Sequence, residues 1–152
     1  MTKFLLSVHV LAAIVAIGPV TVAASMFPAA ARLAIADPHD AAARTTLRTL
    51  HRICRVYAAV GIVVPVFGLA TATSLEVLTD AWLLVSIALT AIAAALLVLR
   101  VLPRQATLLA GVDATKAGAA PGRLAAYTGV FNLLWATVTV LMIVRPGSTT
   151  GV

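Results

Sequence analysis

Residues 37–78 read DPHDAAARTTLRTLHRICRVYAAVGIVVPVFGLATATSLEVL, and they join a basic segment directly to an apolar one. The basic segment carries arginines spaced three or four residues apart, a spacing that puts them on one helix face: Arg44, Arg48, Arg52 and Arg55. Residues 56–75 contain no charged side chain, and their number matches the roughly 20 residues that cross a bilayer core of about 30 Å. We therefore predict a cytoplasmic basic helix over 38–55 that continues as a membrane span over 56–75.

The rest of the chain has the same apolar character. Hydrophobic residues make up 62% of the 152 residues and charged residues only 11%, and the mean hydropathy is +1.08. Further runs long enough to cross a bilayer lie at 4–27, 81–102 and 124–144. Because these runs lack the polar alternation of a transmembrane β-strand, we predict an all-α integral membrane protein. It consists of one membrane domain over 1–152, with four transmembrane helices in an antiparallel bundle.

The segments between the spans carry signals for turns and helix starts. The alanine-rich residues 28–36 predict a short connection, and residues 105–123 predict a loop because glycine, proline and charged residues gather there. Asp37 followed by Pro38 matches an N-cap with a proline in the first turn. Asp80 is expected to cap the third span in the same way.

The distribution of basic residues predicts the orientation in the membrane. Of the 11 lysines and arginines, nine fall on one side of the predicted spans and two, Lys3 and Arg145, on the other. The nine are Arg32, Arg44, Arg48, Arg52, Arg55, Arg100, Arg104, Lys116 and Arg123. The positive-inside rule assigns the larger group to the cytoplasm. We therefore expect both termini outside the cell (N-out/C-out) in a bacterial cytoplasmic membrane. Basic residues confined to span ends do not form a nucleic-acid surface, so no nucleic-acid partner is predicted.

His9 is the one ionisable residue well inside a predicted span, and such residues are candidates for function. A neutral imidazole can bind haem iron or another metal, or relay protons; the alternative is a hydrogen bond between helices. A haem held by two histidines of one chain needs both at one depth, whereas His39 and His51 lie toward the opposite face. The sequence does not identify the metal. The single cysteine, Cys54, cannot by itself form a zinc or iron–sulfur site.

Three further features of the sequence bear on function. The arginine face over 44–55 suggests binding of anionic lipid headgroups, or it serves only to orient the chain. Asn132 lies within the fourth span and is expected to form a hydrogen bond across helices. Pro65, between Gly61 and Gly68, can mark a broken helix of the kind found in transporters, although no membrane-buried acid accompanies it.

Beside the four-span layout, the chain carries His9, Gly18-Pro19, Pro65 with Gly68, Trp82 and the closing Arg145-Pro146-Gly147. In these features it resembles the DUF2269 family of bacterial integral membrane proteins over nearly its whole length. That family has no assigned activity, so the resemblance implies a membrane fold and no catalytic residue. A more distant similarity is to four-helix copper-resistance and haem-biosynthesis membrane families, in which histidines within spans bind haem or metal. This chain departs from them in lacking a second intramembrane histidine.

These observations favour a small non-enzymatic multispan protein. Spans rich in small residues, such as the alanines of 88–95, allow helices to approach closely in lipid. We expect membrane lipids as surroundings and either a homo-oligomer or an accessory subunit of a larger membrane complex. The alternatives are a haem- or metal-binding redox protein that uses His9, and a small transporter or lipid-handling protein.

Overall fold

The computed structural model describes residues 2–111 and 120–147, and every regular element within them is helical. In chain order these are α1 (Thr2–Ala36), α2 (Ala41–Val60), α3 (Val63–Ser74), α4 (Ala81–Leu96), the π-helix η1 (Leu97–Val101), α5 (Leu102–Leu109) and α6 (Ala120–Val144). Four helical segments of this part of the chain are long and apolar enough to cross a membrane: Thr2–Ala36, Ala41–Ser74, Ala81–Leu109 and Pro121–Val144. The predicted all-α class with four membrane-length helices is confirmed, and it indicates a multi-pass membrane protein.

The first helix is longer than expected. The prediction of a connection over 28–36 is wrong, because α1 continues through Pro19 and Pro28 to Ala36. A proline removes one backbone donor, but a membrane helix tolerates this where neighbouring groups compensate. The alanines that follow Pro28 are strong helix formers, so the helix propagates beyond it.

The second span is interrupted where the sequence suggested a break. A turn at Gly61 and Ile62 separates α2 from α3. Pro65 follows one helical turn later and has no N–H to donate to the carbonyl of Gly61, and its ring would clash with that carbonyl in a regular helix. The N–H of Val64 bonds the Gly61 carbonyl instead, at 3.1 Å.

The N-cap of α2 is Asp40 and not Asp37. Asp40 has an extended backbone, and its Oδ1 accepts hydrogen bonds from the N–H groups of Ala42 at 2.8 Å and Ala43 at 3.1 Å. Asp37 instead accepts from the N–H of His39 within the turn that precedes the helix. Asp80 precedes α4 as predicted but makes no capping bond. Its Oδ2 instead accepts a hydrogen bond from Nε1 of Trp82 at 2.9 Å.

The third membrane-length segment also continues past its expected end. A π-helical turn, η1, follows α4 and leads into α5, which has Pro103 in its first turn. A membrane helix tolerates a proline where local π-helical adjustment and neighbouring groups satisfy the freed backbone carbonyl. The prediction of a loop over 105–123 is therefore wrong for residues 105–109, and its part over 112–119 lies outside the described residues. At its other end, α6 begins at Ala120 rather than at 124.

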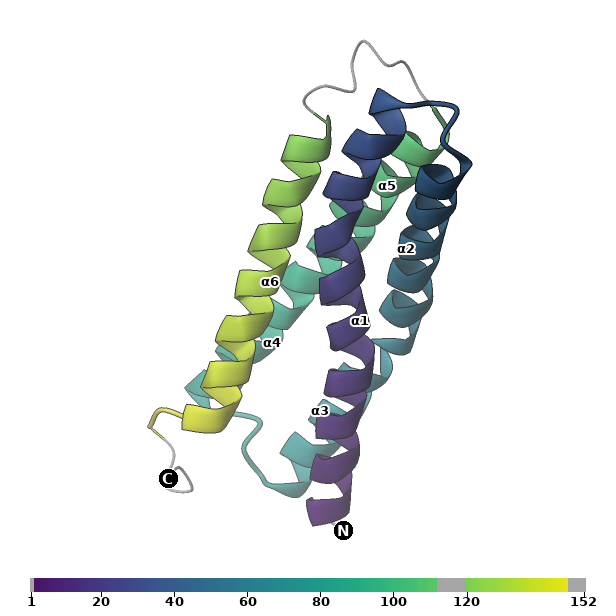
Figure 1. Cartoon of the computed structure of the whole chain (residues 1–152). Helices are drawn as coiled ribbons and strands as arrows, with labels where there is room; N and C mark the ends of the chain where they lie inside the picture. Colours follow the sequence, from purple (N-terminus) through teal and green to yellow (C-terminus); the bar gives the residue numbers. More distant parts are fainter. Residues whose placement is uncertain (1, 112–119, 148–152) are drawn as a thin grey trace.

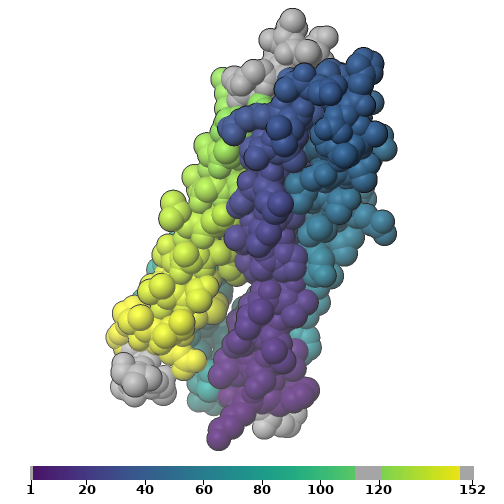
Figure 2. Space-filling view, in the orientation of Figure 1, coloured from purple at the N-terminus to yellow at the C-terminus, as the bar shows by residue number. Residues whose placement is uncertain are grey.

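The helices pack around α1, which contacts α2, α3 and α6, while α4 contacts α6, and α5 contacts α2. In both views α1 runs between α6 and α2 (Figures 1 and 2). The main core joins Phe27 of α1 and Cys54 of α2 to Leu124 and Phe131 of α6. Buried alanines along α1, at 16, 23, 24, 30 and 31, let its neighbours approach closely.

Candidate functional site

His9 lies on α1 and forms a hydrogen bond to α3. Its Nδ1 is 2.9 Å from the backbone carbonyl oxygen of Val64, and the ring is part-buried. Because a carbonyl oxygen only accepts, Nδ1 must carry the hydrogen, and in the neutral ring Nε2 then has a free lone pair. This is the arrangement in which a second hydrogen bond orients a metal-binding histidine. It is equally a hydrogen bond that holds two helices together.

Gly68 of α3 makes room for the His9 ring. A Cβ atom placed on Gly68 would lie 2.9 Å from Cε1 and 3.1 Å from Nδ1 of His9. Distances this short require one of the two residues to move. The contact between α1 and α3 at this position therefore depends on a residue without a side chain.

The other histidines do not assemble a metal centre with His9 in the part of the chain that the structure describes. No group of three or more histidine, cysteine, aspartate or glutamate side chains with metal-binding geometry occurs among residues 2–111 and 120–147. His51 bonds Gln105 of α5, whereas His9 bonds the backbone of α3. The bond to Gln105 thus holds His51 on another pair of helices, and His51 does not serve as a second ligand beside His9.

A buried polar network that the sequence did not predict joins α2 to α5. His51 donates from Nδ1 to Oε1 of Gln105 at 3.0 Å, and Nε2 of Gln105 lies 3.5 Å from Sγ of Cys54. Gln105 and Cys54 are both 0% exposed. Gln105 falls in the loop expected over 105–123, which the glycine, proline and charged residues of that segment predict. The signal that was missed is the apolar spacing of Val101, Leu102, Leu108 and Leu109, which continues the helix around it.

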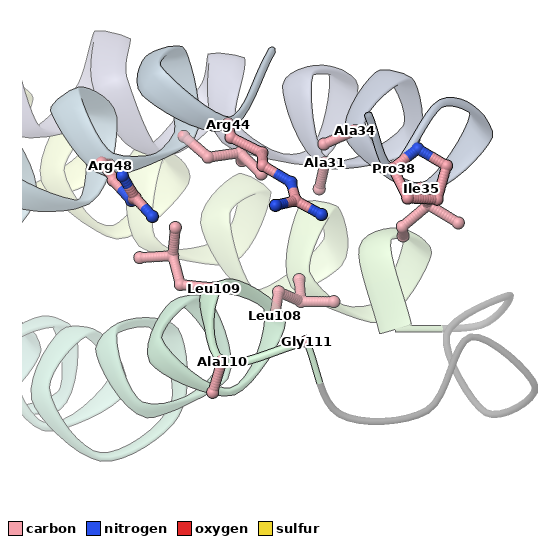
Figure 3. A pocket seen from close by; sticks show the side chains of 11 residues that line it. Ala31, Ala34, Ile35, Pro38, Arg44, Arg48, Leu108, Leu109, Ala110 and Gly111 are labelled. Carbon is pink, nitrogen blue, oxygen red and sulfur yellow. The ribbon is translucent and has the colours of Figure 1, made fainter. Parts of the chain in front are cut away.

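The four arginines of α2 are all exposed, but they have different surroundings. Arg44 and Arg48 line a pocket of about 390 Å³ between the end of α1, the start of α2 and the end of α5, whereas Arg52 and Arg55 do not. Figure 3 shows the side chains of Arg44 and Arg48 directed toward Leu108 and Leu109 of α5. The four arginines look equivalent in the sequence, but in the structure only Arg44 and Arg48 line the pocket.

Asn132 connects α6 to α1. Its Nδ2 donates to Oγ of Ser25 at 3.1 Å, which is a hydrogen bond between helices of the expected kind. Thr128, Asn132 and Trp135 share one face of α6, since they are spaced four and three residues apart. A buried polar atom on each of them, Oγ1, Oδ1 and Nε1 respectively, has no hydrogen-bond partner among the described residues. The hydrogen bond between Asn132 and Ser25 thus links α6 to α1.

Comparison of the chain with models of protein families, with curated proteins and with solved structures gave no match. The resemblance to the DUF2269 family therefore stays a prediction.

Proposed function

We propose that this chain is a non-enzymatic multispan protein of a bacterial cytoplasmic membrane that acts by associating with other membrane proteins. It either associates with further copies of itself as a homo-oligomer or serves as an accessory subunit of a larger complex. The observation that carries the proposal is the outer face of α4, where exposed alanines at 88, 91 and 95 lie between Leu84 and Leu99. Spacings of three and four residues align these side chains, and small residues permit close helix packing in lipid.

The position of α4 leaves this face available. Among the other spans, α4 makes its main contacts with α6, through a side that includes the buried Ser86 and Ala93. The large side chains that are exposed elsewhere on the bundle, such as Phe4 on α1 and Leu133 on α6, need no partner beyond lipid tails. A continuous row of alanines is different, because it presents a shallow surface that another helix can fill.

The proposed orientation places both termini outside the cell and the helices in an antiparallel bundle. In Figure 1 the start of α1 and the end of α6 lie at one end of the molecule, and the connection between α1 and α2 lies at the other. Arg44 and Arg48 belong to that second end, at the start of α2. The positive-inside rule supports a cytoplasmic position for it.

The association is tested by purifying the protein from its native membrane in a mild detergent and measuring its mass by light scattering and native mass spectrometry. We expect a stable oligomer, or stoichiometric protein partners. Ala91→Leu/Ala95→Leu should dissociate the assembly, because the new side chains hold a neighbouring helix away. The matched control, Ala126→Leu/Ala136→Leu, alters two exposed alanines of α6 and should leave the assembly intact. Wild-type protein that is monomeric and free of partners would contradict the proposal.

A second candidate function is haem or metal binding at His9, which the hydrogen bond from Nδ1 to Val64 favours. With Nδ1 occupied, Nε2 is the nitrogen that remains for iron or another metal. Haem-binding protein would show a Soret band, and we expect His9→Ala to remove or shift it. Colourless, metal-free protein, or a Soret band that His9→Ala does not change, would exclude this function.

A further inference from the structure

The pocket between α1, α2 and α5 combines two positive charges with apolar walls. Arg44 and Arg48 supply the charges, and Ala34, Leu47 and Leu108 are among the apolar residues that line it. None of its 11 lining residues is acidic. Its volume of about 390 Å³ falls within the range of ligand pockets, roughly 300–1,000 Å³. The pocket is therefore large enough for a ligand, and its side chains favour an anion that carries an apolar part.

The chemistry of the two arginines narrows the class of anion. A guanidinium group presents several N–H donors in a plane and matches the oxygens of a phosphate in a two-bond geometry. Arg44 and Arg48 are one helical turn apart on α2, so their side chains reach the same region. Figure 3 shows both on the α2 side of the pocket and Leu108 and Leu109 on the opposite side. A phosphate between the arginines would thus lie against apolar side chains.

The apolar walls of the pocket and its place near the membrane interface favour a lipid over a soluble phosphate. Arg48 precedes the uncharged residues 56–75 by eight positions, or about 12 Å of helix. The headgroup layer on each side of the core is about 5–8 Å thick, so Arg48 is anchored just outside it, and its long side chain can reach back to the interface. A free phosphate ion would gain nothing from the leucine, isoleucine and alanine walls, whereas the glycerol and first acyl carbons of a lipid would pack against them.

We propose that this pocket is a binding site for one anionic phospholipid, with its phosphate held by Arg44 and Arg48 and its glycerol and upper acyl chain against α1 and α5. Arg52 and Arg55, on the same helix but outside the pocket, take no part in it. The site differs from a general attraction of basic residues to the membrane surface because it binds one lipid and saturates.

The experiment is native mass spectrometry of the full chain in a mild detergent, titrated with phosphatidylglycerol. Wild-type protein should bind one molecule saturably, and phosphatidylethanolamine should bind more weakly. Arg44→Gln/Arg48→Gln should weaken the binding roughly 10- to 30-fold, since each basic residue near a membrane surface contributes about a factor of five. Arg52→Gln/Arg55→Gln removes the same charge from the same helix and should change the binding less than about threefold.

Three results would overturn the proposal. If both double variants weaken the binding equally, the attraction is diffuse and the pocket plays no special role. If inorganic phosphate displaces the lipid at similar concentrations, the ligand is a soluble anion. Ala34→Leu, which fills the pocket and keeps every charge, must also weaken the binding. Should Arg44→Gln/Arg48→Gln fail to fold, unchanged binding by Ala34→Leu would by itself refute the site.

Discussion

Replacing Gln105 with leucine is expected to lower the free energy of unfolding by about 1–3 kcal/mol, although leucine has a similar size and is less polar. Gln105 is 0% exposed, and its Oε1 accepts the hydrogen of His51 Nδ1 at 3.0 Å. Leucine cannot accept that hydrogen, so the part-buried imidazole loses its partner while the contact to Cys54 is also lost. Unfolding in mixed detergent micelles, followed by circular dichroism, measures the change.

A double variant separates the contribution of the hydrogen bond to stability from that of packing. His51→Leu/Gln105→Leu removes both partners, and its loss of stability should be smaller than the sum of the single losses by about 0.5–3 kcal/mol. Thr107→Leu, on the exposed side of the same helix, serves as the control and should change stability by less than about 0.5 kcal/mol. Strictly additive losses would show that His51 and Gln105 do not act together.

Replacing Gly68 with leucine is expected to lower the free energy of unfolding by about 1–3 kcal/mol, because the new side chain enters space that the His9 ring occupies. The first added carbon would already lie 2.9 Å from Cε1 of His9. The ring must leave its hydrogen bond to Val64, or α3 must move away from α1. The same unfolding measurement detects the loss, and protease accessibility of the start of α1 should rise with it.

Gly129 provides the matched control for Gly68. It lies on α6, and a Cβ atom placed there would meet nothing within 4 Å, so Gly129→Leu should not destabilise the protein. Removing the ring with His9→Ala should restore part of the stability of Gly68→Leu, since the conflict lies between these two residues. If Gly129→Leu is as damaging as Gly68→Leu, the effect belongs to glycine in general and not to the contact with His9.

The sequence indicated one residue of the contact between His9 and Val64, but neither residue of the contact between His51 and Gln105. His9 was recognisable because it interrupts an apolar run, and the glycines and proline at 61, 65 and 68 were recognisable as a weak point of the second span. The pairing of His9 with the Val64 carbonyl was not, because residues 55 positions apart carry no local signal of their contact. The same reason applies to Gln105, whose partners lie on a helix far away in the chain.

The errors in helix ends share one cause. The connection expected over 28–36 begins with Pro28, and the third span is expected to end just before Pro103, as most water-soluble helices end or kink at a proline. In this chain α1 passes through Pro28, and α5 carries Pro103 in its first turn after η1. A local reading of the sequence considers only the backbone hydrogen bond that proline removes. The packing of apolar and alanine residues on both sides of the proline stabilises the helix by more than that bond. The N-cap is Asp40, three residues after the predicted Asp37, because the turn at 37–40 delays the start of the helix.

The sequence by itself determined the all-helical class and the four membrane-length segments, because in lipid every backbone group must be paired within its own helix and about 20 apolar residues are needed for each crossing. It also identified His9, Asn132 and the arginine face as residues of interest. Only the tertiary structure decided that Gln105 joins His51 to Cys54, that Gly68 faces His9, and that Arg44 and Arg48 line a pocket while Arg52 and Arg55 do not. These are contacts between separate helices, and helical periodicity defines the face of each helix without defining which neighbour that face meets.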